Sequence, residues 1–116
     1  MTFPDPSTTK EISINDTLNL IEGAEESFLL IDCREPNEHE ICSIDGADLA
    51  PLSNFEIEAE ILFAENEECA IIYCHHGSRS LKAVEWLRSK GYPNTFSMTG
   101  GIDQWAVEIE TEMPRY

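Results

Sequence analysis

Two short, uninterrupted apolar runs constrain the fold of this chain more than any other feature of its sequence. Residues 28–32 form the first run, which ends in Asp32, and residues 70–73 form the second, which Cys74 follows directly. Runs of this kind are typical of strands that are buried on both faces of a parallel sheet. Apolar residues with helical spacing occur at 55–64 and 81–87. The sequence therefore predicts an α/β fold, with a central, mostly parallel sheet of about five strands and helices on both faces.

The remaining elements are predicted from capping and turn residues. A short strand is expected at Ile12 and Ile14, before a helix that Asp16 or Thr17 caps. The later elements should be a short helix from Asn37, a brief strand toward Pro51, a helix from Ser53, a helix at 80–90, a strand at 95–98 and a last helix after Gly100-Gly101.

The length of 116 residues suits a single domain. Residues 1–10 contain two prolines and lack apolar periodicity, which predicts a flexible N-terminal tail before a domain at 11–116. Trp86 and Trp105 have helical spacing with apolar neighbours, so we expect both in the core.

The chain is strongly acidic, with 23 acidic residues against seven basic ones and a formal net charge of −16. This charge disfavours nonspecific binding to nucleic acid or to an anionic membrane, and we expect neither as a partner. There is no apolar stretch of about 20 residues and no basic or apolar signal region at the start. We therefore expect a soluble, cytoplasmic protein. The acidic stretch at 56–68 should be a solvated face, with a basic protein partner as the alternative.

Four cysteines are present, and without a secretory signal they are expected to be reduced thiols. Cys33, His39 and Cys42 are close in sequence, but their spacing matches no usual zinc motif, so no metal site is predicted. Cys33, Cys42 and Cys69 are expected to be small buried or half-buried side chains. Redox sensing by Cys33 is the alternative.

Cys74 carries the strongest functional signal, because it lies where a strand ends and a helix begins. The backbone N–H groups of the following loop, the helix start and the guanidinium of Arg79 all favour a thiolate over a thiol. Gly77 permits a sharp turn, and His75 and His76 should line the pocket. We therefore predict a cysteine nucleophile in an anion-binding loop made of His75, His76, Gly77, Ser78, Arg79 and Ser80.

Three segments together resemble the rhodanese family of sulfurtransferases. They are Asp32-Cys33-Arg34-Glu35 with Ile44-Asp45-Gly46-Ala47, the loop Cys74–Ser80, and Gly100-Gly101-Ile102-Asp103-Gln104-Trp105. The resemblance extends from about residue 11 to the end. Ser43 and Asp45 replace the histidine and proline that the family commonly has in the first segment. The nucleophile position is intact.

The resemblance implies a sulfurtransferase of the thiosulfate type with a rhodanese-like fold. Cys74 would take the sulfane sulfur of thiosulfate or a related donor, hold it as a persulfide and pass it to cyanide, a thiol or a protein. The implied partners are a small anionic sulfur donor and a sulfur-acceptor protein, and no metal or organic cofactor is implied. Asp32 and Arg34 are predicted to support the loop by bracing it, with a place at the pocket border as the alternative.

Two rival functions stay open at this point. The first is a persulfide carrier or binding module in a sulfur relay, which needs the same Cys74. The second is a cysteine-dependent phosphatase or arsenate reductase. Four residues separate Cys74 from Arg79, whereas tyrosine and dual-specificity phosphatases have five at the corresponding place. The tighter ring should suit a single sulfur better than a phosphate.

Overall fold

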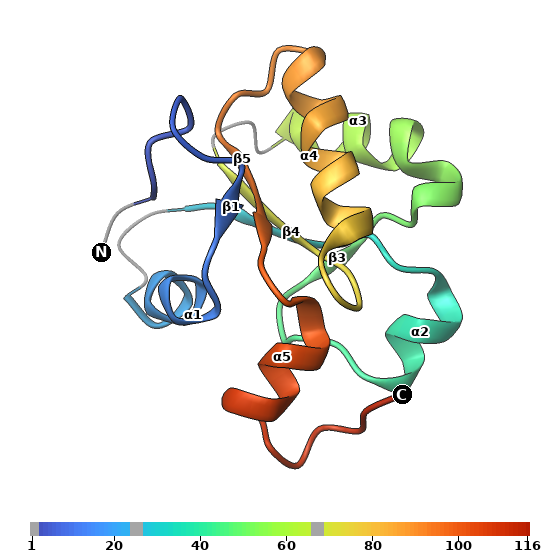
Figure 1. The fold of residues 1–116 in the computed structure, drawn as a ribbon. Helices are drawn as coiled ribbons and strands as arrows, with labels where there is room; N and C mark the ends of the chain where they lie inside the picture. Colours follow the sequence, from blue (N-terminus) through green and yellow to red (C-terminus); the bar gives the residue numbers. More distant parts are fainter. Residues whose placement is uncertain (1–2, 24–26, 66–68) are drawn as a thin grey trace.

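The computed structural model describes residues 3–23, 27–65 and 69–116, and in these ranges the chain forms one parallel sheet (Figure 1). The strands have the order β1-β5-β4-β2-β3. Every neighbouring pair is parallel. This confirms the predicted sheet. Its strands are β1 (Glu11–Ile12), β2 (Leu29–Asp32), β3 (Asp48–Leu49), β4 (Ala70–Tyr73) and β5 (Thr95–Met98).

Helices cover both faces of the sheet, as predicted. The helices α1 (Ile14–Gly23) and α5 (Gly101–Glu108) share one buried cluster with Ile71 and Tyr73 of β4. The helices α3 (Phe55–Glu65) and α4 (Ser78–Ser89) share the other cluster with Ala70 and Ile72. All four residues of β4 are 0% exposed. Each face of the central strand therefore supports its own apolar core, which explains the uninterrupted apolar run.

Two short elements lie at the edge where the strands end. The helix α2 (Pro36–Ile41) follows β2, and a single 3-10 turn (Leu52–Asn54) follows β3 and leads into α3. The expected helix from Ser53 thus begins with a tighter turn. The N–H of Glu35 donates to Oε1 of Glu38 at 3.1 Å, and Pro36 provides the first residue of α2, one position before the predicted Asn37.

The first helix begins earlier than predicted, and Ile14 belongs to it and not to a strand. Ser13 is the reason. Its hydroxyl accepts the N–H of Asp16 at 3.0 Å, and its carbonyl accepts the N–H of Thr17 at 3.0 Å. Ser13 therefore caps the helix, so the strand before it is limited to Glu11–Ile12.

Residues 3–10 contact the domain at several points. The ring of Phe3 packs against those of Phe28 and Phe96, with centroids 5.5 and 5.8 Å apart. The guanidinium of Arg88 donates to the carbonyls of Pro6 and Thr9 at 2.8 and 2.9 Å. These contacts tie the segment to α4 and β5, while the boundary at residue 10 stays a prediction. None of the helices in the described ranges is long and apolar enough to cross a bilayer.

Candidate active site

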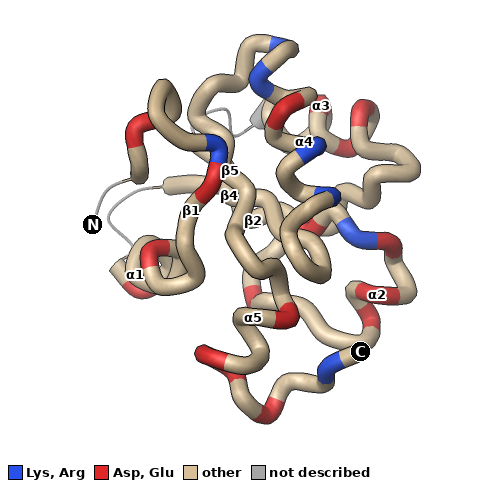
Figure 2. The backbone as a smooth tube through the Cα atoms, in the orientation of Figure 1, with Lys and Arg blue, Asp and Glu red and all other residues tan. Residues whose placement is uncertain are grey.

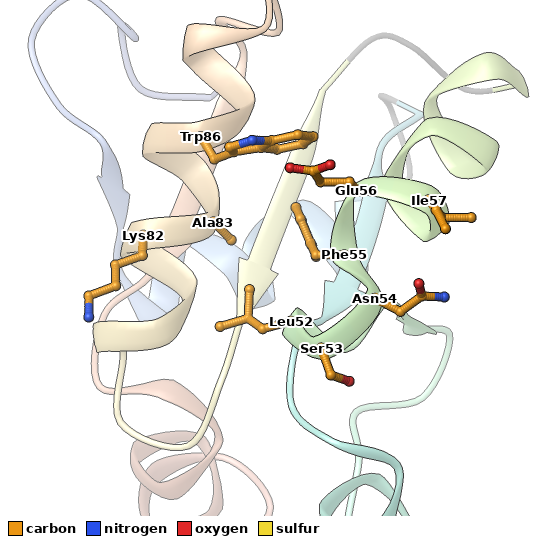
Figure 3. Close-up of a pocket in the computed structure, with 9 residues that line it drawn as sticks. All are labelled: Leu52, Ser53, Asn54, Phe55, Glu56, Ile57, Lys82, Ala83 and Trp86. Carbon is orange, nitrogen blue, oxygen red and sulfur yellow. The ribbon is translucent and has the colours of Figure 1, made fainter.

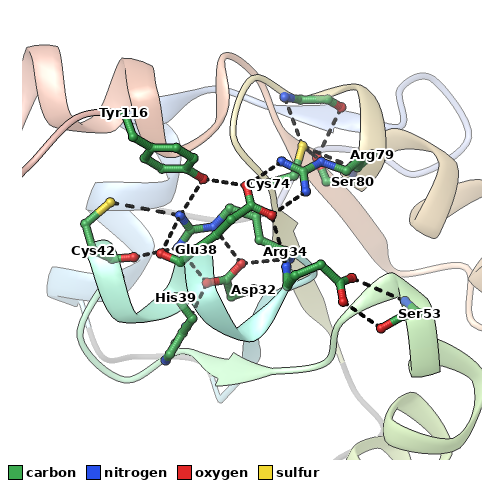
Figure 4. A network of polar contacts seen from close by, with 12 residues as sticks. Asp32, Arg34, Glu38, His39, Cys42, Ser53, Cys74, Arg79, Ser80 and Tyr116 are labelled. Atoms are coloured by element: carbon green, nitrogen blue, oxygen red, sulfur yellow. Dashed lines mark hydrogen bonds and ion pairs between the residues drawn. The ribbon is translucent and has the colours of Figure 1, made fainter.

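Asp32 and Cys74 lie at the same edge of the sheet because β2 and β4 are parallel neighbours. Their register pairs Asp32 with Tyr73, so Cys33 and Cys74 follow at adjacent positions. The cysteine loop, residues 74–80, follows β4, and its last three residues form the first turn of α4 (Figure 4). Ligands of parallel α/β sheets bind at this edge, beyond the carboxyl ends of the strands. The predicted placement of Asp32 and Cys74 is confirmed.

The sulfur of Cys74 is the focus of the loop. It accepts the N–H of Gly77 at 3.0 Å and the N–H of Ser80 at 3.3 Å, and the hydroxyl oxygen of Ser80 lies 3.4 Å away. Gly77 has a φ of +114°, in the left-handed region, which turns the chain back over the sulfur. Two fixed backbone dipoles therefore point at Sγ, as the sequence predicted for an anion-binding loop.

A second hydroxyl extends the contacts of Cys74 into the core. Ser97 of β5 is 0% exposed, and its Oγ lies 2.7 Å from that of Ser80. If Ser97 donates to Ser80 and Ser80 donates to the thiolate, each hydroxyl uses its one proton. Ser97 was not predicted as a site residue, because a single polar residue in a short apolar strand is its only signal in the sequence.

These contacts stabilise the ionised form of Cys74. The pKa of its thiol is lowered to about 4, first by a hydrogen bond from the Cys33 thiol and then by the Ser80 hydroxyl and the N–H groups of Ser80 and Gly77, against the opposing effect of burial. Cys74 is therefore a thiolate at neutral pH. A thiolate is the reactive form of cysteine toward sulfur and other electrophiles.

This low pKa predicts a flat alkylation profile for Cys74. The rate constant for iodoacetamide labelling of the Cys74 peptide should stay constant from about pH 9 to about pH 6, because the thiol is already ionised. Mass spectrometry of the digested protein would measure it. A rate that rises tenfold per pH unit up to about pH 8.5, as for an ordinary thiol, would contradict the assignment.

The first turn of α5 fixes the orientation of the loop. The N–H of Ile102 donates to the carbonyl of Cys74 at 2.8 Å, and the N–H of Asp103 donates to that of His75 at 3.1 Å. Because the N–H and C=O of one peptide point in opposite directions, the amides of His75 and His76 point away from α5. A Cβ at Gly101 would overlap both carbonyls. This close approach explains the second glycine of the Gly100-Gly101 pair.

Arg79 of the cysteine loop is paired with a carboxylate of α2. Nη1 and Nη2 donate to the two carboxylate oxygens of Glu38 at 2.7 and 2.9 Å. This hydrogen-bonded pairing is the largest cause that lowers the pKa of Glu38, to about 2. The pKa of Arg79 is raised, first by Glu38 and also by the charge of Cys74. The guanidinium is thus near the thiolate but is held by α2, and Glu38 is a site residue that the sequence analysis missed.

Asp32 and Arg34 form a buried ion pair under the site (Figure 4). Both side chains are 0% exposed, and Arg34 donates to both Asp32 oxygens at 2.9 and 2.7 Å. Arg34 also donates to the carbonyl of Cys42 at 2.6 Å, and Nδ1 of His39 lies 2.8 Å from Oδ2 of Asp32. The pair therefore links β2 to α2 and the loop after it, which is the geometry of a brace.

Tyr116 lies over the cysteine loop, a position that nothing in the sequence analysis indicated. Its ring stacks on that of His75, with centroids 3.9 Å apart and an angle of 6° between the planes. Its hydroxyl donates to Oε2 of Glu38 at 2.7 Å and accepts from Nη1 of Arg34 at 2.8 Å. The ring of His76 also contacts that of His75, with centroids 4.0 Å apart. Burial lowers the pKa of His75, so this ring is neutral at pH 7.

A separate groove of about 430 Å³ lies between α4 and the start of α3 (Figure 3). It is lined by Leu52, Ser53, Asn54, Phe55, Glu56, Ile57, Lys82, Ala83 and Trp86, so none of its lining residues belongs to the cysteine loop. Trp86 is only partly buried and packs edge-on against Phe55, at 5.8 Å between centroids. The predicted core position is therefore confirmed for Trp105, which is 2% exposed, and only in part for Trp86.

Charge is distributed unevenly around the site. Figure 2 shows acidic residues on most elements, whereas four of the seven basic residues are on α4 or directly after it, namely Arg79, Lys82, Arg88 and Lys90. Within the described ranges, no group of three or more histidine, cysteine or acidic side chains could hold a metal ion. The absence of a metal site stays a prediction for the whole chain.

Comparisons with known proteins identify the family. The model of the Rhodanese-like domain matches residues 13–108. The chain is 32% identical over 106 residues to a thiosulfate sulfurtransferase GlpE of Pseudoalteromonas translucida, covering 91% of this chain and 97% of that protein. It is 35% identical over 89 residues to a Rhodanese-like/PpiC domain-containing protein 12 of Arabidopsis thaliana, covering 75% of this chain but only 30% of the plant protein.

A solved structure supports the same conclusion. The crystal structure of a rhodanese-related protein from Thermoplasma volcanium superposes with a TM-score of 0.72 and 30% sequence identity, covering 90% of this chain and 95% of that one. Proteins of one family thus match this chain over nearly its whole length. The matched part includes the sheet, the helices on both faces and the cysteine loop. This chain belongs to the Rhodanese-like domain family.

Proposed function

We propose that the protein is a sulfurtransferase that moves a sulfane sulfur from thiosulfate, or a related anionic donor, to a thiophilic acceptor through a persulfide on Cys74. The observation that carries the proposal is the thiolate of Cys74, held by the N–H groups of Gly77 and Ser80 at the ligand-binding edge of the sheet. The similarity to a bacterial thiosulfate sulfurtransferase over 97% of that protein supports the choice of reaction.

The first step is a displacement at sulfur. The Cys74 thiolate attacks the outer sulfur of thiosulfate. The S–S bond of thiosulfate breaks, and sulfite leaves with the electron pair of that bond. Cys74 then carries a persulfide, and one negative charge is on its outer sulfur. The amide dipoles of the cysteine loop stabilise this charge without reorganising, because α5 already holds the loop carbonyls on the opposite side.

The second step returns the enzyme to its starting state. A nucleophilic acceptor such as cyanide attacks the outer sulfur, the persulfide S–S bond breaks, and Cys74 leaves as a thiolate. A leaving thiol of low pKa accelerates this step. The same stabilised thiolate therefore serves as nucleophile in the first half and as leaving group in the second, which accounts for one cysteine at the centre of the site.

The direct test is thiocyanate formation by the purified protein from thiosulfate and cyanide. We expect turnover with thiosulfate and no release of p-nitrophenol from p-nitrophenyl phosphate. Phosphatase activity without thiocyanate would instead favour the cysteine-dependent phosphatase alternative. A carrier in a sulfur relay would load sulfur in a single turnover and transfer it slowly to cyanide, so the two rates separate a carrier from a small-molecule enzyme.

Arg79 should contribute to thiosulfate binding through the N–H groups that do not donate to Glu38. Replacing Arg79 with alanine is expected to lower kcat/KM for thiosulfate about tenfold, equivalent to about 1.4 kcal/mol, because it removes a permanent positive charge near the dianion. Glu38→Gln should lower KM for thiosulfate, because a neutral amide binds the Arg79 guanidinium more weakly than the Glu38 carboxylate does. Steady-state kinetics of both variants measure this, and an unchanged Arg79→Ala enzyme would show that loop amides alone bind the donor.

A further inference from the structure

Cys33 is a buried thiol beside the nucleophile that the proposed reaction does not use. It follows β2 directly and is 0% exposed, and Cys74 is 1% exposed. Both belong to the same buried cluster on the α3 and α4 side of the sheet. The sequence predicts a small core side chain at Cys33, and the structure places it in the same buried cluster as the reactive cysteine.

The backbone brings the two cysteines within the range of a disulfide. Asp32 and Tyr73 are register partners, and the N–H of Cys33 donates to the carbonyl of Tyr73 at 3.0 Å. The next residue of each strand is therefore a direct neighbour across the pair. Neighbouring strands lie about 4.8 Å apart, and a disulfide requires a Cα to Cα distance of about 4.4–6.8 Å. The spacing of the two backbones is therefore within the range that a disulfide between Cys33 and Cys74 requires.

The protonation states of the two sulfurs differ. The interaction between the two sulfurs is the largest cause that raises the pKa of Cys33 and lowers that of Cys74. Burial raises the pKa of Cys33 further, so Cys33 keeps its proton while Cys74 is ionised. At rest, Cys33 is therefore a proton donor to the nucleophile. The same proton is available to a departing group once Cys74 carries sulfur.

We propose that Cys33 is a resolving thiol, which attacks the Cys74 persulfide when no acceptor removes the sulfur and forms a Cys33–Cys74 disulfide with release of hydrosulfide. The inference rests on the proposed persulfide chemistry. It adds a second outcome for the bound sulfur, in which the two cysteines form a disulfide that must be reduced before the next turnover.

The reaction balances without an external oxidant. A bond forms between the sulfurs of Cys33 and Cys74, and the bond between Cys74 and the outer sulfur breaks. The outer sulfur takes that electron pair and the proton of Cys33, and leaves as HS⁻. The outer sulfur is reduced, and the two cysteine sulfurs share the oxidation that thiosulfate supplied. An external acceptor attacks the outer sulfur, whereas Cys33 attacks the inner one, so the two reactions compete for one intermediate.

The raised pKa and complete burial of Cys33 determine which reaction of the persulfide occurs first. A thiol that is held protonated attacks slowly, so an acceptor at working concentration removes the sulfur first. Cys33 is 0% exposed, so it does not itself meet a free donor or acceptor. The disulfide should therefore accumulate only after the donor has loaded Cys74 and no acceptor is present.

The test follows one loaded turnover of the full chain under anaerobic conditions. The protein is treated with thiosulfate, freed of excess donor by gel filtration, and sampled over time for intact mass and released sulfide. In the wild type we expect a gain of one sulfur atom, then its loss with two hydrogens, and about one equivalent of sulfide per protein. Digestion without reduction should yield one linked peptide pair, Cys33 with Cys74.

Cys33→Ser is the variant that removes the resolving thiol. It should load one sulfur and keep it several-fold longer than the wild type, with no sulfide released. Cys69→Ser is the matched control, since Cys69 lies just before β4, at the opposite end of that strand from Cys74, and it should behave as the wild type. If Cys33→Ser fails to fold, the disulfide mapping of the wild type still decides the question.

Two results would overturn the inference alone: equal persulfide lifetimes in the wild type and Cys33→Ser, or a linkage of Cys74 to Cys42 or Cys69. A protein that never gains sulfur would overturn the proposed sulfurtransferase function as well. The mass after the thiosulfate step therefore separates failure of the function from failure of the resolving role.

Discussion

Replacing Cys74 with serine is expected to abolish thiocyanate formation, with a loss in kcat of at least about 1,000-fold. A serine hydroxyl is not ionised at neutral pH, whereas the Cys74 thiol has a pKa of about 4 in its loop. The hydroxyl also cannot hold sulfur as a persulfide that a weak nucleophile such as cyanide would cleave. The proposed reaction therefore loses both its nucleophile and its intermediate in one substitution.

The fold should survive this change, because serine has nearly the shape of cysteine and can bond the same amides. Circular dichroism and the urea midpoint of Cys74→Ser should stay close to those of the wild type. Cys69→Ser serves as the matched control for a cysteine-to-serine change, and it should retain full activity. Residual turnover by Cys74→Ser above a few per cent of the wild-type rate would show that another group carries the sulfur.

Replacing Arg34 with methionine is expected to destabilise the protein by about 3–5 kcal/mol, the usual cost of breaking a buried ion pair. The side-chain nitrogens of Arg34 donate six hydrogen bonds, and its Asp32 partner is 0% exposed. Methionine fills much of the volume but leaves the Asp32 carboxylate without its main counter-charge. The desolvated charge, and not the lost packing, should account for most of the destabilisation.

Urea unfolding of two further variants separates these contributions. Arg115→Met removes an ion pair with Asp103, but the Arg115 side chain is 57% exposed, so the loss of stability should be far smaller than that of Arg34→Met. The double variant Asp32→Asn with Arg34→Met should be more stable than Arg34→Met alone, because it leaves no uncompensated charge. Equal losses for Arg34→Met and Arg115→Met would contradict the bracing role of the buried pair.

The sequence was sufficient to predict the elements that depend on local patterns. The apolar run at β4, the cysteine loop after it and the glycine turn before α5 all have short-range signals, and the structure confirms their positions. The error at Ile14 has an equally local cause, because a serine one residue earlier caps the helix. Alternating apolar residues alone could not distinguish a strand that continues from one that ends at a cap.

The parts of the site that the sequence did not predict depend on contacts across long separations. Glu38 and Arg79 are 41 residues apart, and Tyr116 reaches Arg34 across 82 residues. Cys33 lies beside Cys74 only because β2 and β4 pair in one particular register. No periodicity or capping rule specifies such pairings, so the sequence alone predicts neither the Glu38 partner of Arg79 nor the position of Cys33 beside Cys74.

The most direct test of the proposed function is the intact mass of the protein after exposure to thiosulfate and rapid removal of the excess donor. The persulfide chemistry predicts a gain of one sulfur atom in the wild type and in Cys69→Ser, reversed by cyanide with formation of thiocyanate. It predicts no gain in Cys74→Ser. A wild-type protein of unchanged mass that produces no sulfide, or a sulfur gain that persists in Cys74→Ser, would contradict a persulfide on Cys74.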